Sequence, residues 1–175
     1  MKPIAIVLII LCIGVIFCTG YLYMSANIQI TATGCVATDA TYLSASYEAL
    51  KESLKQQTFS GTVFNAELPE NPEDALFLTY TVELKNATFL PADTLELQIT
   101  PLAGDMLQMA PLTDVVLQGL MQWDWNPVQI NLPAQSSARV SATLLTGKDS
   151  HSIRDMKITW YQWGLPFSAT VRYSH

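Results

Sequence analysis

The segment KDSHSIRD, residues 148–155, contains the side-chain types from which hydrolases build a catalytic triad. Asp149, Ser150 and His151 are an acid, a hydroxyl nucleophile and a base at consecutive positions. A triad, however, places these groups at separate corners of a site, which neighbouring residues on one loop rarely reach. The sequence also lacks the Gly-x-Ser-x-Gly motif that exposes the nucleophile in one group of hydrolases. We therefore interpret the segment as a polar hairpin loop and predict no catalytic residue, with an enzyme that uses His151 as an alternative.

The four tryptophans form two groups in the sequence. Trp123 and Trp125 flank Asp124 in QWDWNP, and Trp160 and Trp163 lie in TWYQWG. Residues two apart in an extended strand project to the same side, so the first pair can stack against a sugar ring or a peptide. The odd spacing of the second pair predicts that Trp160 is a core residue and that Trp163 packs against the following turn. Our candidate ligand-binding residues are Trp123, Trp125 and Trp163, and a carbohydrate-binding surface module is another alternative.

Metal and cofactor sites have few candidates in this chain. His151 and His175 are the two histidines, and no pair of cysteines has the spacing of zinc ligands. Glu70, Glu73 and Asp74 form an acidic loop, but Asp or Asn does not recur at every second position as it does in a calcium-binding loop. The glycines are too isolated for a phosphate-binding loop. The sequence therefore predicts no metal and no cofactor.

The N-terminal segment has the length and composition of a membrane-spanning helix. Residues 4–24 contain no charge, and at about 1.5 Å per residue they cover roughly the 30 Å hydrocarbon core of a bilayer. A cleaved signal peptide has a shorter apolar core and small residues before the cleavage site. Neither Cys18-Thr19-Gly20 nor Met24-Ser25-Ala26 provides a good cleavage site. We predict that residues 1–26 form an uncleaved signal anchor.

The distribution of charge predicts orientation and partners. Lys2 precedes the apolar segment, and the first charged residues after it are Asp39 and Glu48, so the positive-inside rule places the C-terminal part outside the cytoplasm. The formal net charge of −6 disfavours binding to nucleic acid and to anionic lipid headgroups. We predict a single-pass protein of the cell membrane with an extracytoplasmic C-terminal domain. Its predicted partners are the membrane, through the N-terminal helix, and an envelope protein or a glycan.

Cys35 is the one cysteine that follows the apolar segment, because Cys12 and Cys18 lie within it. Cys35 can therefore pair between chains, remain a thiol, or carry a lipid. ATGC, residues 32–35, places a small residue before the cysteine, as lipidation requires. A lipidated cysteine normally follows the apolar core directly, whereas ten residues separate Cys35 from Met24. We expect a free or buried thiol.

Asn86-Ala87-Thr88 is an acceptor sequon for N-glycosylation. It follows a predicted strand, where we expect an exported turn. The sequon therefore predicts a glycan on Asn86 if the host is eukaryotic.

The spacing of apolar residues predicts one helix after the apolar segment. Residues 28–33 alternate as a short first strand, and the following apolar residues recur at spacings of 4, 3 and 4, which is one face of a helix. The helix is expected over residues 41–57, with Asp39 or Thr41 as its cap. Its apolar face is predicted to pack on a sheet or a partner helix, because acidic and basic residues alternate on the outer face and disfavour a position on the membrane surface. That face consists of Leu43, Tyr47, Leu50 and Leu54.

From Gly61 on, short runs at strand period are separated by turn-forming residues, which is typical of an antiparallel sandwich or barrel. The alternation is most regular in residues 76–84 and 95–99, which we expect to be half-buried strands. The other predicted strands are 61–68, 115–117, 128–132, 138–144, 156–163 and 168–173. The predicted core consists of Leu78, Tyr80, Val82, Leu95, Leu97, Ile99, Val140 and Trp160.

The segments TVELKNAT, LELQITP and INLPAQSSARVSATL resemble the immunoglobulin-like modules of bacterial envelope proteins, which include fibronectin-type and late-embryogenesis-abundant-like sandwiches. The resemblance covers about residues 61–173. In it, KN marks the turn at a strand end and LPAQSSA the polar step between two strands. The resemblance implies a scaffold or binding role and carries over no catalytic residue.

These observations together predict an all-β protein. We expect an immunoglobulin-like antiparallel β-sandwich with one added N-terminal helix, preceded by a single transmembrane helix. The signal anchor occupies residues 1–26, a juxtamembrane strand and an amphipathic helix occupy 27–60, and the sandwich occupies 61–175. The predicted function is that of a membrane-anchored extracytoplasmic binding or scaffold module of the cell envelope, without catalytic activity.

Overall fold

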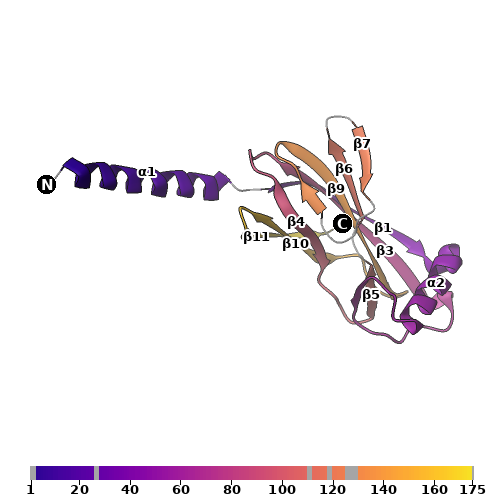
Figure 1. Cartoon of the computed structure of the whole chain (residues 1–175). Helices are drawn as coiled ribbons and strands as arrows, with labels where there is room; N and C mark the ends of the chain where they lie inside the picture. The colour runs from indigo at the N-terminus through magenta and orange to yellow at the C-terminus, as the bar shows by residue number, and fades with distance from the viewer. Residues whose placement is uncertain (1–2, 26–27, 110–111, 118–119, 125–129, 175) are drawn as a thin grey trace.

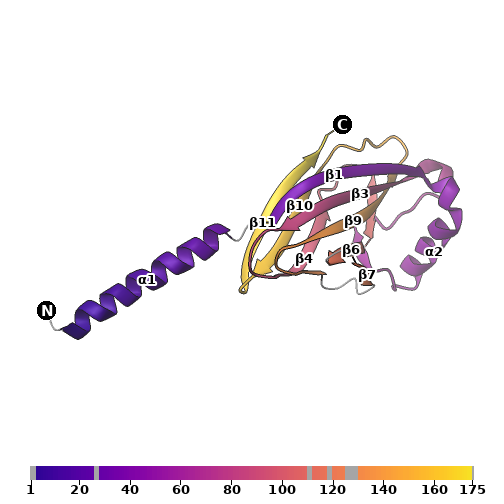
Figure 2. The ribbon, with the colours of Figure 1, turned by 90° about the horizontal axis from the view of Figure 1, so that it is seen from above.

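The structure is a computed structural model that describes residues 3–25, 28–109, 112–117, 120–124 and 130–174. Within these ranges the chain forms an apolar N-terminal helix and two antiparallel β-sheets that pack face to face (Figures 1 and 2). The elements are α1 (Pro3–Ser25), β1 (Ile28–Asp39), η1 (Ala40–Leu43), α2 (Ser44–Lys55), β2 (Gly61–Val63), η2 (Pro72–Asp74), β3 (Ala75–Asn86), β4 (Ala92–Ile99), β5 (Asp105–Met109), β6 (Leu112–Leu117), β7 (Leu120–Asp124), β8 (Ile130–Leu132), β9 (Ser136–Gly147), β10 (Arg154–Gln162) and β11 (Leu165–Tyr173).

Helix α1 extends away from the sheets (Figure 1). Over Pro3–Tyr21 it is long and apolar enough to cross a membrane, and none of this stretch is buried inside the molecule. A signal sequence near an N-terminus has the same length and composition. The structure thus confirms an apolar N-terminal helix.

The larger sheet has the strand order β1-β3-β9-β5-β2, with β6 paired to β9 and β7 paired to β6. The smaller sheet has the order β11-β10-β4-β8. β3 pairs with β1 from Ile28 opposite Asn86 to Asp39 opposite Leu76. The strand expected at residues 28–33 is therefore longer, and it belongs to the same sheet as the strands after residue 61. The ranges 27–60 and 61–175 therefore share one sheet.

The main core lies between the two sheets. All eight residues predicted for it are at most 3% exposed, and they come from β3, β4, β9 and β10, so that both sheets contribute. Burying a large aliphatic or aromatic side chain contributes about 1.5–3 kcal/mol. Trp160 is confirmed as a core residue, and its ring stacks on Phe167 with 6.1 Å between the ring centroids.

A second, smaller core lies on the opposite face of the larger sheet, under α2. Tyr47 of α2 is fully buried there with Phe77 of β3 and Leu145 of β9, and its hydroxyl donates to the Pro69 carbonyl at 2.7 Å. This confirms that the apolar face of the helix packs on a sheet. Leu43 is exposed instead, because it belongs to a 3₁₀ turn, whose three residues per turn rotate its side chain off the α-helical face.

Asp39 begins this helical region, as its sequence position predicts. Its carboxylate accepts hydrogen bonds from the backbone N–H of Thr41 at 3.0 Å and from the Thr41 hydroxyl at 2.8 Å. The backbone bond is the largest of the effects that hold the pKa of Asp39 below its usual value, followed by the bond from the Thr41 hydroxyl, and the Lys148 ammonium lowers the pKa further. Asp39 thus caps η1, which leads directly into α2.

The strand registers give the domain two ends. Where β1 begins, Ile28 pairs with Asn86 and Asn86 with Ser136, and α1 precedes this end; we call it the α1 end. Where β1 finishes, Asp39 pairs with Leu76, and η1 and α2 follow; we call this the distal end. β1 has 12 residues, and the 11 steps between them, at roughly 3.3 Å each, separate the two ends by about 36 Å. Figure 2 shows α1 and α2 at opposite ends of the sheets.

Candidate functional site

The segment around His151 lies at the distal end, where it surrounds a buried guanidinium. The side chains of Arg154 and Asp105 are both 0% exposed, and Arg154 Nη2 lies 2.8 Å from Asp105 Oδ1. Arg154 also donates to the Ser150 hydroxyl at 2.8 Å and to the His151 carbonyl, while Asp105 accepts from the Thr146 hydroxyl at 2.7 Å. A buried ion pair is tolerated when further hydrogen bonds satisfy both charges, as they do here. Because Asp105 is on β5 and Arg154 on β10, the pair ties the two sheets together.

These contacts give the Ser150 and His151 side chains a structural role. A general base has to lie within hydrogen-bond reach of the hydroxyl that it activates. The Ser150 hydroxyl accepts a hydrogen bond from Arg154 Nη2 at 2.8 Å, and His151 Nδ1 lies 3.3 Å from Arg154 Nη1. The loop thus supplies hydrogen-bond acceptors to Arg154.

Two of the three candidate tryptophans, Trp123 and Trp163, have a described backbone, and they lie on different elements. Trp163 is 56% exposed and occupies the turn between β10 and β11 in the smaller sheet. Trp123 lies on β7 opposite Asp114, at the margin of the larger sheet. Its side chain and the whole of Trp125 fall outside the described residues. A stacking platform formed by Trp123 and Trp125 therefore stays a prediction.

Cys35 lies in the middle of β1, opposite Tyr80 of β3. It is a half-buried free thiol that packs against the main core, and burial raises the pKa of this thiol. Lipidation at Cys35 would remove the part of β1 that precedes it, including Ile28, which is buried in the core. The pairing of β1 with β3 therefore favours the thiol interpretation.

The asparagine side chain of the Asn86 sequon is buried in the folded protein. Asn86 is 0% exposed, and its side-chain amide donates to the carbonyls of Leu90 at 2.8 Å and Pro133 at 3.0 Å. Its Oδ1 accepts from the backbone N–H and the hydroxyl of Thr88. Thr88 in turn accepts from Gln162 Nε2 at 3.0 Å, which connects this turn to β10. In the folded state the acceptor nitrogen of Asn86 is occupied by main-chain carbonyls, which disfavours a glycan at this position.

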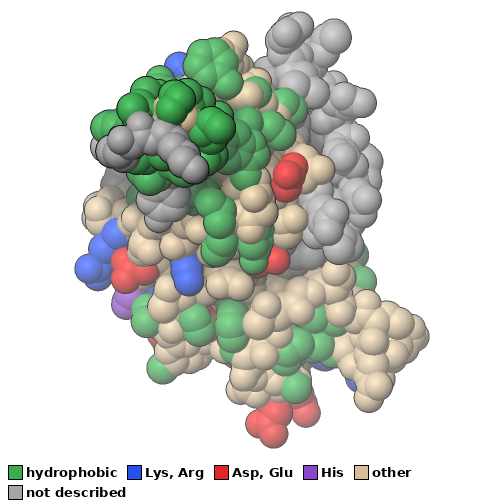
Figure 3. Space-filling model, turned by 60° about the vertical axis from the view of Figure 1, so that its left-hand side comes forward, with side chains coloured by type: hydrophobic (Ala, Val, Ile, Leu, Met, Phe, Trp, Pro, Cys, Tyr) green, Lys and Arg blue, Asp and Glu red, His purple; other side chains and the backbone are tan. Residues whose placement is uncertain are grey.

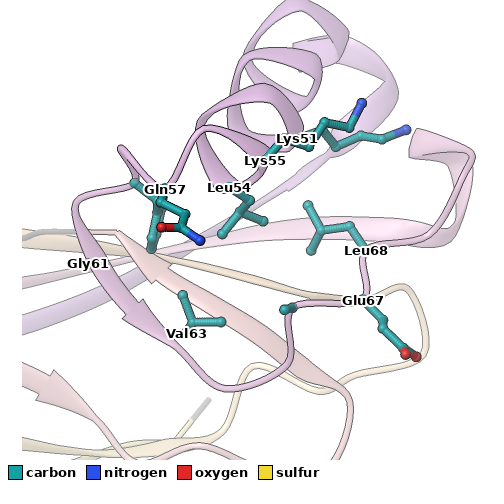
Figure 4. A pocket seen from close by; sticks show the side chains of 10 residues that line it. Lys51, Leu54, Lys55, Gln57, Gly61, Val63, Glu67 and Leu68 are labelled. Carbon is teal, nitrogen blue, oxygen red and sulfur yellow. The ribbon is translucent and has the colours of Figure 1, made fainter.

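A pocket of about 700 Å³ lies beneath α2 at the distal end (Figure 4). Leu54 and Lys51 of α2 form one wall, and Val63 and Leu68 form the facing wall. Figure 4 shows the side chains of Leu54, Leu68 and Val63 directed into the space between the walls. The pocket is therefore lined largely by apolar side chains, the composition of many ligand sites.

Two lysines stand on the α2 side of the pocket. The Lys51 ammonium donates to the Glu70 carbonyl at 3.2 Å and lies 5.6 Å above the centre of the Tyr47 ring, so its position is fixed. Lys55 is 72% exposed, and its ammonium lies 4.0 Å from the Glu52 carboxylate. Such an exposed pair contributes little energy, so Lys55 can exchange Glu52 for an anionic ligand group at small cost.

Strand β2 borders the pocket and is the outermost strand at its side of the larger sheet. Within the described ranges it pairs with β5 alone, and its three residues are exposed. Gly61 has a φ of +147°, and a Cβ at this position would lie 2.2 Å from the Gln108 carbonyl oxygen. Only glycine permits this approach of β2 to β5. Exposed strand edges of this kind accept extended peptides.

Sequence reasoning did not single out the pocket. The sequence predicts the helix face and the segment GTVFNAEL, residues 61–68, as structural elements. The space between these two elements, which forms the pocket, depends on the pairing of β2 with β5. The sequence pattern does not predict β5. The sequence signal that remained was the pair Lys51 and Lys55 beside an apolar helix face in an acidic chain.

No family model matches the sequence, and no curated protein matches it. Among solved structures, the chain is similar to the GAE domain of yeast GGA1, with 15% identity over 62% of this chain and 86% of that chain, at a TM-score of 0.33. It is also similar to a family 123 glycoside hydrolase from Clostridium perfringens, with 12% identity over 81% of this chain and 27% of that chain, at a TM-score of 0.29. Similarity at this level carries no argument about function, so the proposals below rest on the geometry of this chain.

Proposed function

We propose that the protein is a membrane-anchored extracytoplasmic binding module, built on an immunoglobulin-like β-sandwich and acting without catalysis. The observation that carries the proposal is the apolar pocket beneath α2, with Lys51 and Lys55 on its rim and the edge of β2 beside it. The 12 residues of β1 separate this pocket from α1 by about 36 Å. A span at one end and a pocket at the other suit a tether that holds its binding surface away from the bilayer.

The orientation of this tether follows from charge. Lys2 precedes α1, and acidic residues follow it, which favours an N-terminus in the cytoplasm. The two-sheet domain then lies on the outer side of the membrane.

We infer that the ligand is an extended segment of a partner protein that carries apolar side chains and an acidic group. The leucines and Val63 of the pocket bury apolar side chains, and the edge of β2 offers backbone groups for the addition of a strand. The Lys55 ammonium supplies the charge complement. Lys51 and Lys55 outnumber Glu67 among the charged residues that line the pocket, so the pocket has a local excess of positive charge in a chain that is acidic overall, and this favours an anionic ligand.

The test uses the full chain in lipid nanodiscs as bait for a display library of short random peptides. Enriched peptides should combine apolar residues with Asp, Glu or a free carboxylate. Lys55→Glu should weaken binding of an enriched peptide by about tenfold or more, equal to at least roughly 1.4 kcal/mol. The matched control is Lys157→Glu, a reversal of charge at an exposed lysine of β10 that does not line the pocket.

Two outcomes would overturn the proposal. Enriched peptides that bind Lys55→Glu and the unchanged chain equally well would place the binding surface elsewhere. Failure to enrich any peptide would remove the protein-binding role.

A further inference from the structure

The α1 end exposes apolar side chains that the core does not use. Phe89, between β3 and β4, is 81% exposed, Trp163 is 56% exposed, and Leu165 at the start of β11 is about half exposed. The two connections that carry them are neighbours, because Gln162 Nε2 donates to the Thr88 hydroxyl at 3.0 Å. We call Phe89, Trp163 and Leu165 the aromatic tip. These side chains lie at one end of the molecule and come from turns that a buried hydrogen bond holds together.

The backbone at Trp163 is in a conformation that a bulky residue rarely adopts. Gln162 pairs with Leu165, so Trp163 and Gly164 are the two central residues of the hairpin turn, with φ values of +55° and +71°. Positive φ at both positions characterises a type I′ turn, in which asparagine, aspartate or glycine is favoured at the first position. Tryptophan is disfavoured there by contact of its Cβ with the backbone. A strained and exposed residue of this kind points to a role outside the fold.

The short connection between α1 and β1 places the aromatic tip close to the end of the apolar helix. α1 ends at Ser25 and β1 begins at Ile28, so three Cα-to-Cα steps of about 3.8 Å limit the separation to roughly 11 Å. Ile28 pairs with Asn86, three positions before Phe89. If α1 spans a bilayer, the turns at this end therefore lie at the level of the lipid headgroups.

The surface around this end suits a lipid interface. Figure 3 shows the molecule with α1 directed toward the viewer, and most of the described surface beside α1 is hydrophobic or uncharged. Tryptophan is enriched at the boundary between headgroups and acyl chains, where its ring is partly apolar and its N–H can reach water. The net charge of −6 disfavours anionic headgroups, so insertion of apolar side chains is the expected driving force.

We propose that Phe89, Trp163 and Leu165 insert into the outer headgroup region of the bilayer that α1 spans. This inference rests on the membrane anchor of the proposed function and adds a second contact with the same membrane. With α1 and the aromatic tip both engaged, the domain stands in a fixed orientation. The pocket beneath α2 then faces away from the lipid.

The test compares the full chain with Trp163→Asn, a substitution that suits the turn, after reconstitution into phosphatidylcholine vesicles. Tryptophan emission is quenched from the membrane by phosphatidylcholine brominated near the headgroup, and from the water by iodide. The difference between the two proteins isolates Trp163 from the other three tryptophans. We expect this difference signal to be quenched at least severalfold more by the brominated lipid than by iodide.

The matched control places a tryptophan at the distal end. Tyr42, in η1, is 85% exposed, so Tyr42→Trp in the Trp163→Asn background should show the reverse pattern, with strong quenching by iodide and none by the brominated lipid. A Trp163 signal that follows the pattern of the Tyr42→Trp control would overturn membrane docking.

Extraction of the vesicles with alkaline carbonate separates the two proposals. Release of the chain would show that α1 is not an anchor, and it would overturn the proposed function and the docking together. Retention of the chain with Trp163 open to iodide would overturn the docking alone. Retention with Trp163 quenched by lipid supports both.

Discussion

The two ends of the domain use different side chains to satisfy the backbone groups at the ends of their strands. Where strands end, backbone groups lose their sheet partners and need others. At the α1 end a neutral side chain, Asn86, donates to the carbonyls of Leu90 and Pro133. At the distal end a charged side chain, Arg154, donates to the His151 carbonyl and pairs with Asp105. Both groups connect the larger sheet to the smaller one, so each end is closed by polar contacts rather than by apolar packing alone.

This difference predicts which end loses more stability when its polar partner is removed. A neutral amide that loses its contacts leaves unsatisfied dipoles, whereas a broken ion pair leaves an isolated charge in the interior. The distal end should therefore be the more vulnerable of the two. It also carries the pocket, so the end that depends more on its polar partner is the one proposed to bind a ligand.

The largest effect is expected when the buried ion pair is broken. Arg154→Met leaves the Asp105 carboxylate buried without its partner and should lower the free energy of unfolding by about 3–5 kcal/mol. Denaturant unfolding of the full chain in detergent measures this change. The control is Arg172→Met, since Arg172 and Asp155 form an exposed pair at 3.6 Å whose loss should cost less than about 1 kcal/mol. Equal effects of the two substitutions would contradict the structural role of Arg154.

An intermediate effect is expected at the α1 end. Asn86→Ala leaves carbonyls and the Thr88 N–H without a partner and should cost about 2 kcal/mol, less than the loss of Arg154. The same unfolding measurement applies, with Asn71→Ala as the control, because Asn71 is exposed and makes no side-chain capping bond. If Asn86→Ala proved more damaging than Arg154→Met, the ranking of the two ends would be reversed.

The smallest effect is expected to have the opposite sign. Trp163→Asn relieves the left-handed backbone of the turn and should raise the free energy of unfolding in detergent by up to about 1 kcal/mol. Tyr161→Asn removes a nearby exposed aromatic side chain from the regular strand β10, where asparagine is disfavoured, and should not stabilise the protein. A loss of stability on Trp163→Asn would mean that the ring contributes to the fold, and the argument from strain would fail.

Most of the sheet structure was predictable because the main strands bury one face. β3, β4, β9 and β10 alternate between buried and exposed or half-buried residues, which the sequence pattern reveals directly. β5 was missed because Asp105 to Gln108 are all buried, so no alternation exists. Gln108 takes an interior position as a polar residue: it donates to the Leu97 carbonyl and accepts from the Ile99 N–H, both at 3.0 Å. The Gln108 amide thus bonds backbone groups that a neighbouring strand would otherwise bond. In the sequence, a polar residue at such a position is more typical of a loop than of a buried strand.

The candidate sites were harder to predict than the strands. His151 and Asn86 were singled out for chemistry that they share with catalytic loops and glycosylation sites, yet both lie in segments that satisfy buried groups of the fold. The type of each residue shows that its side chain can form hydrogen bonds. Only the fold determines whether the hydrogen-bond partner is a ligand or the main chain. The pocket beneath α2 has no local pattern, since its walls meet through the close approach of Gly61 to β5.

The continuity of β1 has a mechanical consequence. This strand connects α1 directly to η1 and α2, and its 12 residues are already extended. An extended chain reaches at most about 3.3–3.6 Å per residue, so β1 has little slack. If α1 spans a membrane and the proposed ligand is held against α2, a pull on the ligand travels along the covalent backbone of β1 to α1. Under tension the protein behaves as a stiff link rather than as a spring.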